Sequence, residues 1–218
     1  MKTKSLKKLS LSDANLLLTI TIVVFFLMYI GAMIFEGGGF LKAQTFFNIL
    51  NANGALVITA CGLSLVMITG SIDISVGGVV ALVSMSCAVY LDFMGGNVFV
   101  SLLIALGIGL AFGLVQGFLV AYLDIQPFIV TLAGMFFARG MTSIVHTDPF
   151  NVQNEAFVKL KDTRVIVPGM GSVNRIGKYV NAYVEIGVVV AILIVIIMFV
   201  LLRWTKPVSY THLRAHET

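Results

Sequence analysis

The sequence predicts an all-α integral membrane protein with about six transmembrane helices. Of its 218 residues, 59% are hydrophobic and only 11% are charged, and the mean hydropathy is +1.03. Soluble domains contain about 25% charged residues, and a soluble protein of this size cannot bury so much apolar surface. The apolar stretches are continuous and do not alternate, which argues against a transmembrane β-barrel. The composition excludes a soluble enzyme, a nucleic-acid-binding protein and a disordered chain.

Each predicted span is an apolar stretch that reaches or approaches the roughly 20 residues a membrane helix needs. The predicted spans are residues 16–34, 46–69, 76–91, 98–122, 125–138 and 185–202. The first follows a lysine-rich start, but it is longer than the apolar core of a secretory signal and lacks a cleavage site, so we expect it to be retained. The fifth is short and only marginally able to cross the membrane.

Positive charges near both ends predict the orientation of the chain. Four lysines lie within residues 2–8, and Arg203 and Lys206 follow the last span. Positively charged loops stay in the cytoplasm, and an even number of spans returns the chain to the side where it started. We therefore expect both termini in the cytoplasm and the polar segment 139–184 outside.

The sequence contains no recognisable catalytic or metal-binding motif. A phosphate-binding G-x-x-x-x-G-K-[ST] loop and the patterns HExxH, GxSxG and CxxC are all absent. Cys61 and Cys87 lie inside apolar stretches, where cysteine acts as a small buried side chain. His212 and His216 have a spacing of four residues, which we interpret as incidental in a terminal tail. The sequence therefore predicts no catalytic residue, no metal site and no cofactor.

Glycines form a stripe along the fourth span. Gly109, Gly113 and Gly117 have a spacing of four residues, which places them on one face of a helix. Such a face lets another helix approach closely, so we predict helix packing there; a wall of a transport pathway is the alternative. Gln116 lies on the same helix, where its amide must find a partner or face a wet cavity.

Residues 70–78 interrupt the apolar sequence between the second and third spans. Three glycines and two serines surround Asp73, a composition that lets a helix break. Broken helices in membranes are buried in protein or line water, and transporters place substrate sites at such breaks. A cytoplasmic turn with a solvated carboxylate is the alternative. The candidate residues of a substrate pathway are Ser71, Asp73, Ser75, Gln116 and Thr131.

Two of these residues have a predicted structural role as well. Asp73 precedes the third span, so we expect it to accept hydrogen bonds from two or three backbone N–H groups that open this helix, assisted by Ser75. Thr131 follows Pro127, which suits the first turn of a helix. We expect the Thr131 hydroxyl to bond to the backbone of its own helix.

Three motifs together resemble the permease subunits of bacterial ABC importers for simple sugars, such as the ribose and galactofuranose permeases. They are Gly70-Ser-Ile-Asp-Ile-Ser-Val-Gly77, the glycine-rich fourth span, and Gln126-Pro-Phe-Ile-Val-Thr-Leu132 with Arg139-Gly140. The resemblance covers residues 45–145, with the motifs in the same order and spacing. Ser71 and Ile74 depart mildly from the family's usual Gly and Leu.

The resemblance implies an ABC permease fold and ATP-driven import of a pentose or hexose across the bacterial inner membrane. The implied partners are a cytoplasmic ATP-binding subunit, a periplasmic sugar-binding protein and a second, identical or homologous permease subunit. One alternative is a permease of the same superfamily for another solute, such as branched-chain amino acids. A standalone channel or secondary transporter is another, but it would need ionisable residues inside its spans, and only Asp73 qualifies.

The end of the chain departs from the family pattern. Family members continue after the sixth span with Phe-Gly, a cytoplasmic coupling loop and further spans. Residues 207–218 instead resemble a translated sequencing adapter. We therefore expect residues 1–206 to be the N-terminal part of a permease, followed by a non-native tail.

Overall fold

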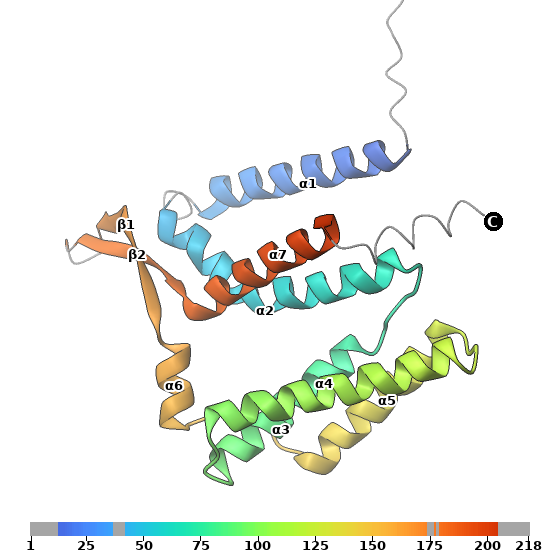
Figure 1. The fold of residues 1–218 in the computed structure, drawn as a ribbon. Helices are drawn as coiled ribbons and strands as arrows, with labels where there is room; N and C mark the ends of the chain where they lie inside the picture. Colours follow the sequence, from blue (N-terminus) through green and yellow to red (C-terminus); the bar gives the residue numbers. More distant parts are fainter. Residues whose placement is uncertain (1–12, 37–41, 174–176, 178, 205–218) are drawn as a thin grey trace, which may run out of the picture. The chain divides into compact units, whose positions relative to one another are not determined.

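The computed structural model describes residues 13–36, 42–173, 177 and 179–204. The elements, in chain order, are α1 (Asp13–Glu36), α2 (Ala43–Ile68), α3 (Val76–Asp92), α4 (Val98–Ala121), α5 (Pro127–Val145), α6 (Glu155–Lys161), β1 (Arg164–Val173), β2 (Tyr179–Glu185) and α7 (Ile186–Trp204) (Figure 1). The lysines of residues 2–8, Lys206 and the predicted tail 207–218 lie outside the described residues.

The predicted all-α membrane class is confirmed. In the part of the chain that is described, α1, α2, α4, α5 and α7 contain stretches long and apolar enough to cross a membrane. Helix α3 is apolar but has only 17 residues. Since an α-helix rises about 1.5 Å per residue, α3 is about 25 Å long, which is short of the roughly 30 Å of a hydrocarbon core.

The predicted end of the fifth span is wrong by seven residues. The sequence predicts a span over residues 125–138, whereas α5 continues to Val145. The charge of Arg139 predicts the start of the polar segment, but its side chain is exposed on the helix and does not interrupt it. The Thr142 hydroxyl donates to the Ala138 carbonyl at 2.8 Å within the continuing helix. The polar segment therefore begins at His146.

The polar segment contains ordered elements that the sequence analysis did not predict. Helix α6 is followed by β1 and β2, which pair as a two-stranded sheet. Valine, isoleucine and tyrosine favour strands, but the charges and turn residues around them had indicated only an external loop. Gly171 lets the strands approach, because a Cβ there would lie 2.6 Å from the Val180 carbonyl oxygen.

The chain divides into two compact units, residues 1–49 with 167–182 and residues 50–166 with 183–218. In the second unit, α3 packs against both α4 and α5, and α4 packs against α5. Within the same unit, α2 meets α7 at Gly54, where a Cβ would lie 3.5 Å from the backbone of Gly187. The Glu185 N–H, just before α7, donates to Asn51 Oδ1 on α2 at 2.9 Å.

The close approach between helices occurs at a glycine outside the predicted stripe. A Cβ on Gly78 would lie 2.8 Å from the Met135 carbonyl oxygen, so α3 and α5 meet almost backbone to backbone. By contrast, no described neighbouring atom lies within 4 Å of a Cβ placed at Gly109, Gly113 or Gly117. The packing face predicted on α4 therefore stays a prediction, and its partner would have to come from outside the described residues.

A pair of leucine substitutions separates the two sets of glycines. Gly78→Leu should destabilise the chain by about 1–3 kcal/mol, because the added side chain forces apart two packed backbones. Gly113→Leu should leave the stability of the single chain unchanged or slightly higher, since leucine favours the helix more than glycine does. Thermal unfolding in detergent micelles measures both effects. Equal destabilisation by the two variants would contradict the packing described here.

Candidate functional site

The helix break predicted over residues 70–78 is present, and its first half is a defined helix end. Gly70 has a φ of +77°, a left-handed conformation that glycine adopts without steric cost. The Gly70 N–H donates to the Met67 carbonyl at 3.0 Å, and the Ser71 N–H donates to the Val66 carbonyl at 3.3 Å. This pair of bonds is the Schellman motif, which satisfies carbonyl groups at the end of α2.

Asp73 forms the second half of the break by bonding to Ser75. Asp73 Oδ1 accepts hydrogen bonds from the Ser75 N–H at 2.8 Å and from the Ser75 hydroxyl at 2.6 Å. Ser75 is only 2% exposed and directly precedes α3. The carboxylate therefore accepts from one backbone N–H and one hydroxyl, whereas we had expected two or three backbone donors. These two charge-assisted bonds fix the turn from which α3 starts.

Helices α4 and α5 each contribute a polar side chain to the break. Ser75 Oγ lies 3.3 Å from Gln116 Oε1 on α4. Thr131 on α5 is 6% exposed, and its hydroxyl lies 3.3 Å from two carbonyl oxygens, that of Phe128 on its own helix and that of Ile72 in the break. The expected bond of Thr131 to its own helix is therefore present, and the same hydroxyl also reaches the break.

Four of the five predicted pathway residues thus gather around one helix break. Asp73, Ser75 and Gln116 are joined by side-chain contacts, and Thr131 contacts the carbonyl of Ile72, the residue before Asp73. Ser71 enters the described contacts through its backbone N–H. The break contacts α4 and α5 near their ends: Gln116 is five residues before the end of α4 and Thr131 is four residues after the start of α5. At about 1.5 Å per residue, these positions are about 6–8 Å from the helix ends.

The proton of Ser75 decides how the Gln116 amide can interact. A hydroxyl can donate one hydrogen bond, and the Ser75 hydroxyl donates it to Asp73 at 2.6 Å. The Gln116 amide can then stabilise Ser75 Oγ only by donating an N–H to it. The buried Nε2 has no hydrogen-bond partner among the described residues, and a half-turn of the amide, which exchanges its oxygen and nitrogen, would give it Ser75 Oγ as an acceptor.

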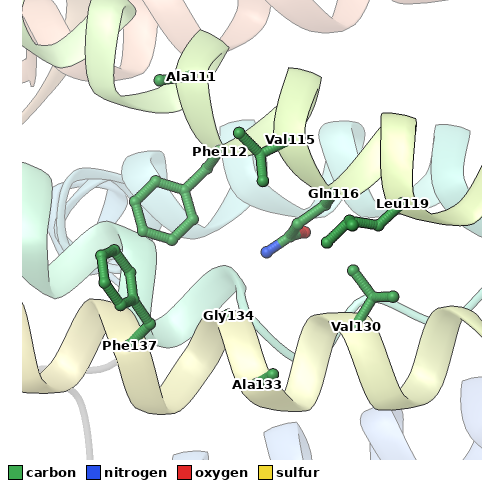
Figure 2. A pocket seen from close by; sticks show the side chains of 9 residues that line it. All are labelled: Ala111, Phe112, Val115, Gln116, Leu119, Val130, Ala133, Gly134 and Phe137. Atoms are coloured by element: carbon green, nitrogen blue, oxygen red, sulfur yellow. The ribbon is translucent and has the colours of Figure 1, made fainter.

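Gly134 leaves the space that the Gln116 amide occupies. A Cβ on Gly134 would overlap Gln116 Nε2, and Figure 2 shows the amide reaching from α4 toward α5 near Gly134. Glycine spacing within one helix does not reveal Gly134. Here the glycine lies on α5 and the side chain that it accommodates lies on α4.

An apolar cavity of about 410 Å³ lies beside this amide, between α4 and α5 (Figure 2). It is lined by Ala111, Phe112, Val115, Gln116, Leu119, Val130, Ala133, Gly134 and Phe137. Gln116 is its polar lining residue. Among the described residues, no group of three or more His, Cys, Asp or Glu side chains could hold a metal ion. The chemistry offered by this site is hydrogen bonding at a break within an apolar helix bundle.

Comparison with known protein families identifies the chain. The model of the family described as "Branched-chain amino acid transport system / permease component" matches residues 45–207, from α2 to the end of α7. The chain belongs to this family. The predicted resemblance to permease subunits is thereby confirmed. Members of the family are described as permease components of a transport system.

Three curated relatives are named as permease proteins, and the first of them as an ABC transporter permease protein. The Inner membrane ABC transporter permease protein YjfF of Escherichia coli (strain K12) is 35% identical over 177 residues, which are 81% of this chain and 53% of the relative. The Fructose import permease protein FruG of Bifidobacterium longum is 31% identical over 94% of this chain and 58% of the relative. The Galactofuranose transporter permease protein YtfT of Escherichia coli is 41% identical over 45% of this chain and 28% of the relative. The chain spans about half the length of the first two, and no solved structure matches it.

Substitutions of Asp73 test the described break in this permease-family chain. Asp73→Ala should destabilise the chain by about 1–2 kcal/mol, because the Ser75 N–H and hydroxyl both lose their acceptor. Asp73→Asn should have a much smaller effect, since the amide oxygen can still accept from both groups. Chemical unfolding in detergent micelles measures the difference. If the two variants lose equal stability, the negative charge itself is required and the hydrogen-bond account is wrong.

Proposed function

We propose that the chain is the transmembrane permease subunit of an ATP-driven, binding-protein-dependent importer of a simple sugar. The observation that carries this proposal is the family match over α2 to α7, combined with the names of the relatives. FruG is named as a fructose permease, YtfT as a galactofuranose permease, and the related protein RbsC of Escherichia coli as a ribose permease. The proposed solute is therefore a pentose or a hexose.

A branched-chain amino acid is the second candidate solute, because the family's description names it. Relatives that match nearly the whole of this chain carry more weight than the family description, since FruG matches 94% of it and is named for a sugar. A sugar also needs neutral hydrogen-bonding groups along its path, whereas an amino acid carries two opposite charges that need charged partners. In the break, one carboxylate and three neutral polar side chains fit the sugar better.

The proposed partners are a cytoplasmic ATP-binding subunit, a periplasmic sugar-binding protein and a second permease subunit. The sequence has no phosphate-binding loop, so we assign ATP hydrolysis to the partner subunit. We propose the bacterial inner membrane as the location, with both termini in the cytoplasm. The external side would then be the end of the bundle where α3 ends and α4 begins.

We assign the helix break to the wall of the solute pathway. Asp73, Ser75, Gln116 and Thr131 come together inside the bundle at a break, and non-helical backbone at membrane depth occurs where it is buried in protein or lines water. The Gln116 amide nitrogen carries two N–H groups, so after the half-turn one can bond to Ser75 Oγ and the other is a donor that a solute hydroxyl or a water molecule could use. Ser71 belongs to the same segment and is assigned to the pathway with it.

A chimeric permease tests this function with known partners. Residues 45–206 of this chain would replace the matching part of FruG, in cells that retain the other components of that importer. We expect uptake of labelled fructose, with no uptake of leucine, and reduced uptake by the Asp73→Ala chimera at equal amounts in the membrane. Uptake of leucine in place of sugar would assign the chain to the second candidate solute. A chimera that reaches the membrane and transports neither solute would contradict the proposal.

A further inference from the structure

The end of α3 opposite the break is bonded to a segment that is distant in the sequence. Asp92, the last residue of α3, accepts the Gln153 N–H at 2.8 Å on Oδ2 and 3.0 Å on Oδ1, and the Asn154 N–H at 2.9 Å on Oδ1. A carboxylate is unfavourable at the C-terminus of a helix, because the helix dipole is negative there. The stability of α3 alone therefore does not explain why a carboxylate stands at position 92. The hydrogen bonds of Asp92 to the backbone of residues 153 and 154 explain it.

Asn154 reinforces the same connection from the other side. Its side-chain Nδ2 lies 3.2 Å from the Leu91 carbonyl oxygen and 3.2 Å from the Gly96 carbonyl oxygen. Its Oδ1 accepts the Phe157 N–H at 3.2 Å, so the same side chain caps the start of α6. Asn154 thus connects α6 to the end of α3 and to the turn that leads into α4.

The segment held by these bonds lies over a cavity. We define residues 152–160 as the strap. A cavity of about 760 Å³ is lined by α3, α4 and the strap, and the strap contributes Val152, Phe157 and Leu160 to the lining. Cys87 on α3 and Ser101 on α4 line the cavity as well, and Ser101 is only 7% exposed. Val152 and Phe157 are half-buried against the bundle, and Leu160, which is 47% exposed, lies at the rim of the cavity.

The outer side of the strap is charged and carries little of its attachment. Glu155 and Lys159 form an ion pair at 3.7 Å, with side chains that are 90% and 80% exposed. Exposed ion pairs of this kind contribute little to stability. The hydrogen bonds of Asp92 and Asn154 are therefore the main polar attachment that the structure shows between the strap and the bundle.

We infer that the strap is a cover that closes the cavity between α3 and α4, and that Asp92 and Asn154 are positioning residues that hold it shut. With these bonds intact, the apolar strap side chains lie against α3 and α4. When these bonds are lost, the strap separates locally from α3 and α4, and water reaches the C-terminal part of α3. This inference concerns the fold of the chain itself and does not rest on the proposed transport function.

Cys87 is a built-in probe of this opening, because it lines the covered cavity. The 218-residue chain would be purified in detergent micelles, where both ends of the bundle reach water, so the result does not depend on the orientation in a membrane. A Cys61→Ser background leaves Cys87 as the thiol to be labelled with a water-soluble maleimide. Asp92→Ala should raise the labelling rate about 10- to 100-fold, since bonds to a charged group set the population of the open form. Asn154→Ala should act in the same direction.

Two controls separate opening of the strap from general loss of structure. Asp148→Ala removes an exposed carboxylate after α5 and should leave the rate unchanged. Asp92→Asn keeps one acceptor oxygen and should give a rate between those of Asp92→Ala and the unmodified chain. In a Cys87→Ser background, Cys61 on α2 should label at the same rate with or without Asp92→Ala. An unchanged Cys87 rate in Asp92→Ala, or an equal rise at Cys61, would overturn the inference.

Discussion

Between α2 and α3 the chain leaves the helical path, and the packing around residues 70–75 depends on how the backbone groups freed there find partners. The Schellman motif at Gly70 ends α2, and Asp73 holds the Ser75 N–H and hydroxyl where α3 begins. Side chains from α4 and α5 then reach the same turn. Because the break is bonded to both neighbours, the start of short α3 is fixed against two longer helices.

The sequence predicted the elements that depend on composition and missed those that depend on contacts between distant residues. Continuous apolar stretches located the helices to within a few residues, and the glycines and serines around Asp73 located the break. The α5 boundary was wrong because a charged residue on an outer helix face does not end a helix. Gly78 and Gly134 were not predicted as packing positions, because the atoms that leave no room for a side chain there belong to another helix. Spacing within one helix identified Gly109, Gly113 and Gly117, which face no described neighbour.

In the polar segment, too, composition predicts the general character, whereas contacts between distant residues determine the structure. Its charges and turn residues predict an external loop, and nothing in local patterning indicates that Asp92 bonds to residues about sixty positions later. The structure makes the first part of this segment a strap over α3 and α4 and the second part a pair of strands. Family membership over residues 45–207 places both parts within the matched region of the permease component. The two ends of α3 are therefore held differently, one by a helix break and the other by the strap.

Gly134 makes room for the Gln116 amide at Ser75, and a double-mutant cycle in detergent micelles measures the coupling between these two residues. Gly134→Ala should destabilise the chain by about 1–3 kcal/mol, because the new methyl group overlaps the amide. In a Gln116→Ala background the same substitution should cost little, since the overlapping atoms are gone. The coupling energy between the two sites should be about 1–2 kcal/mol. Additive effects of the two substitutions would contradict it.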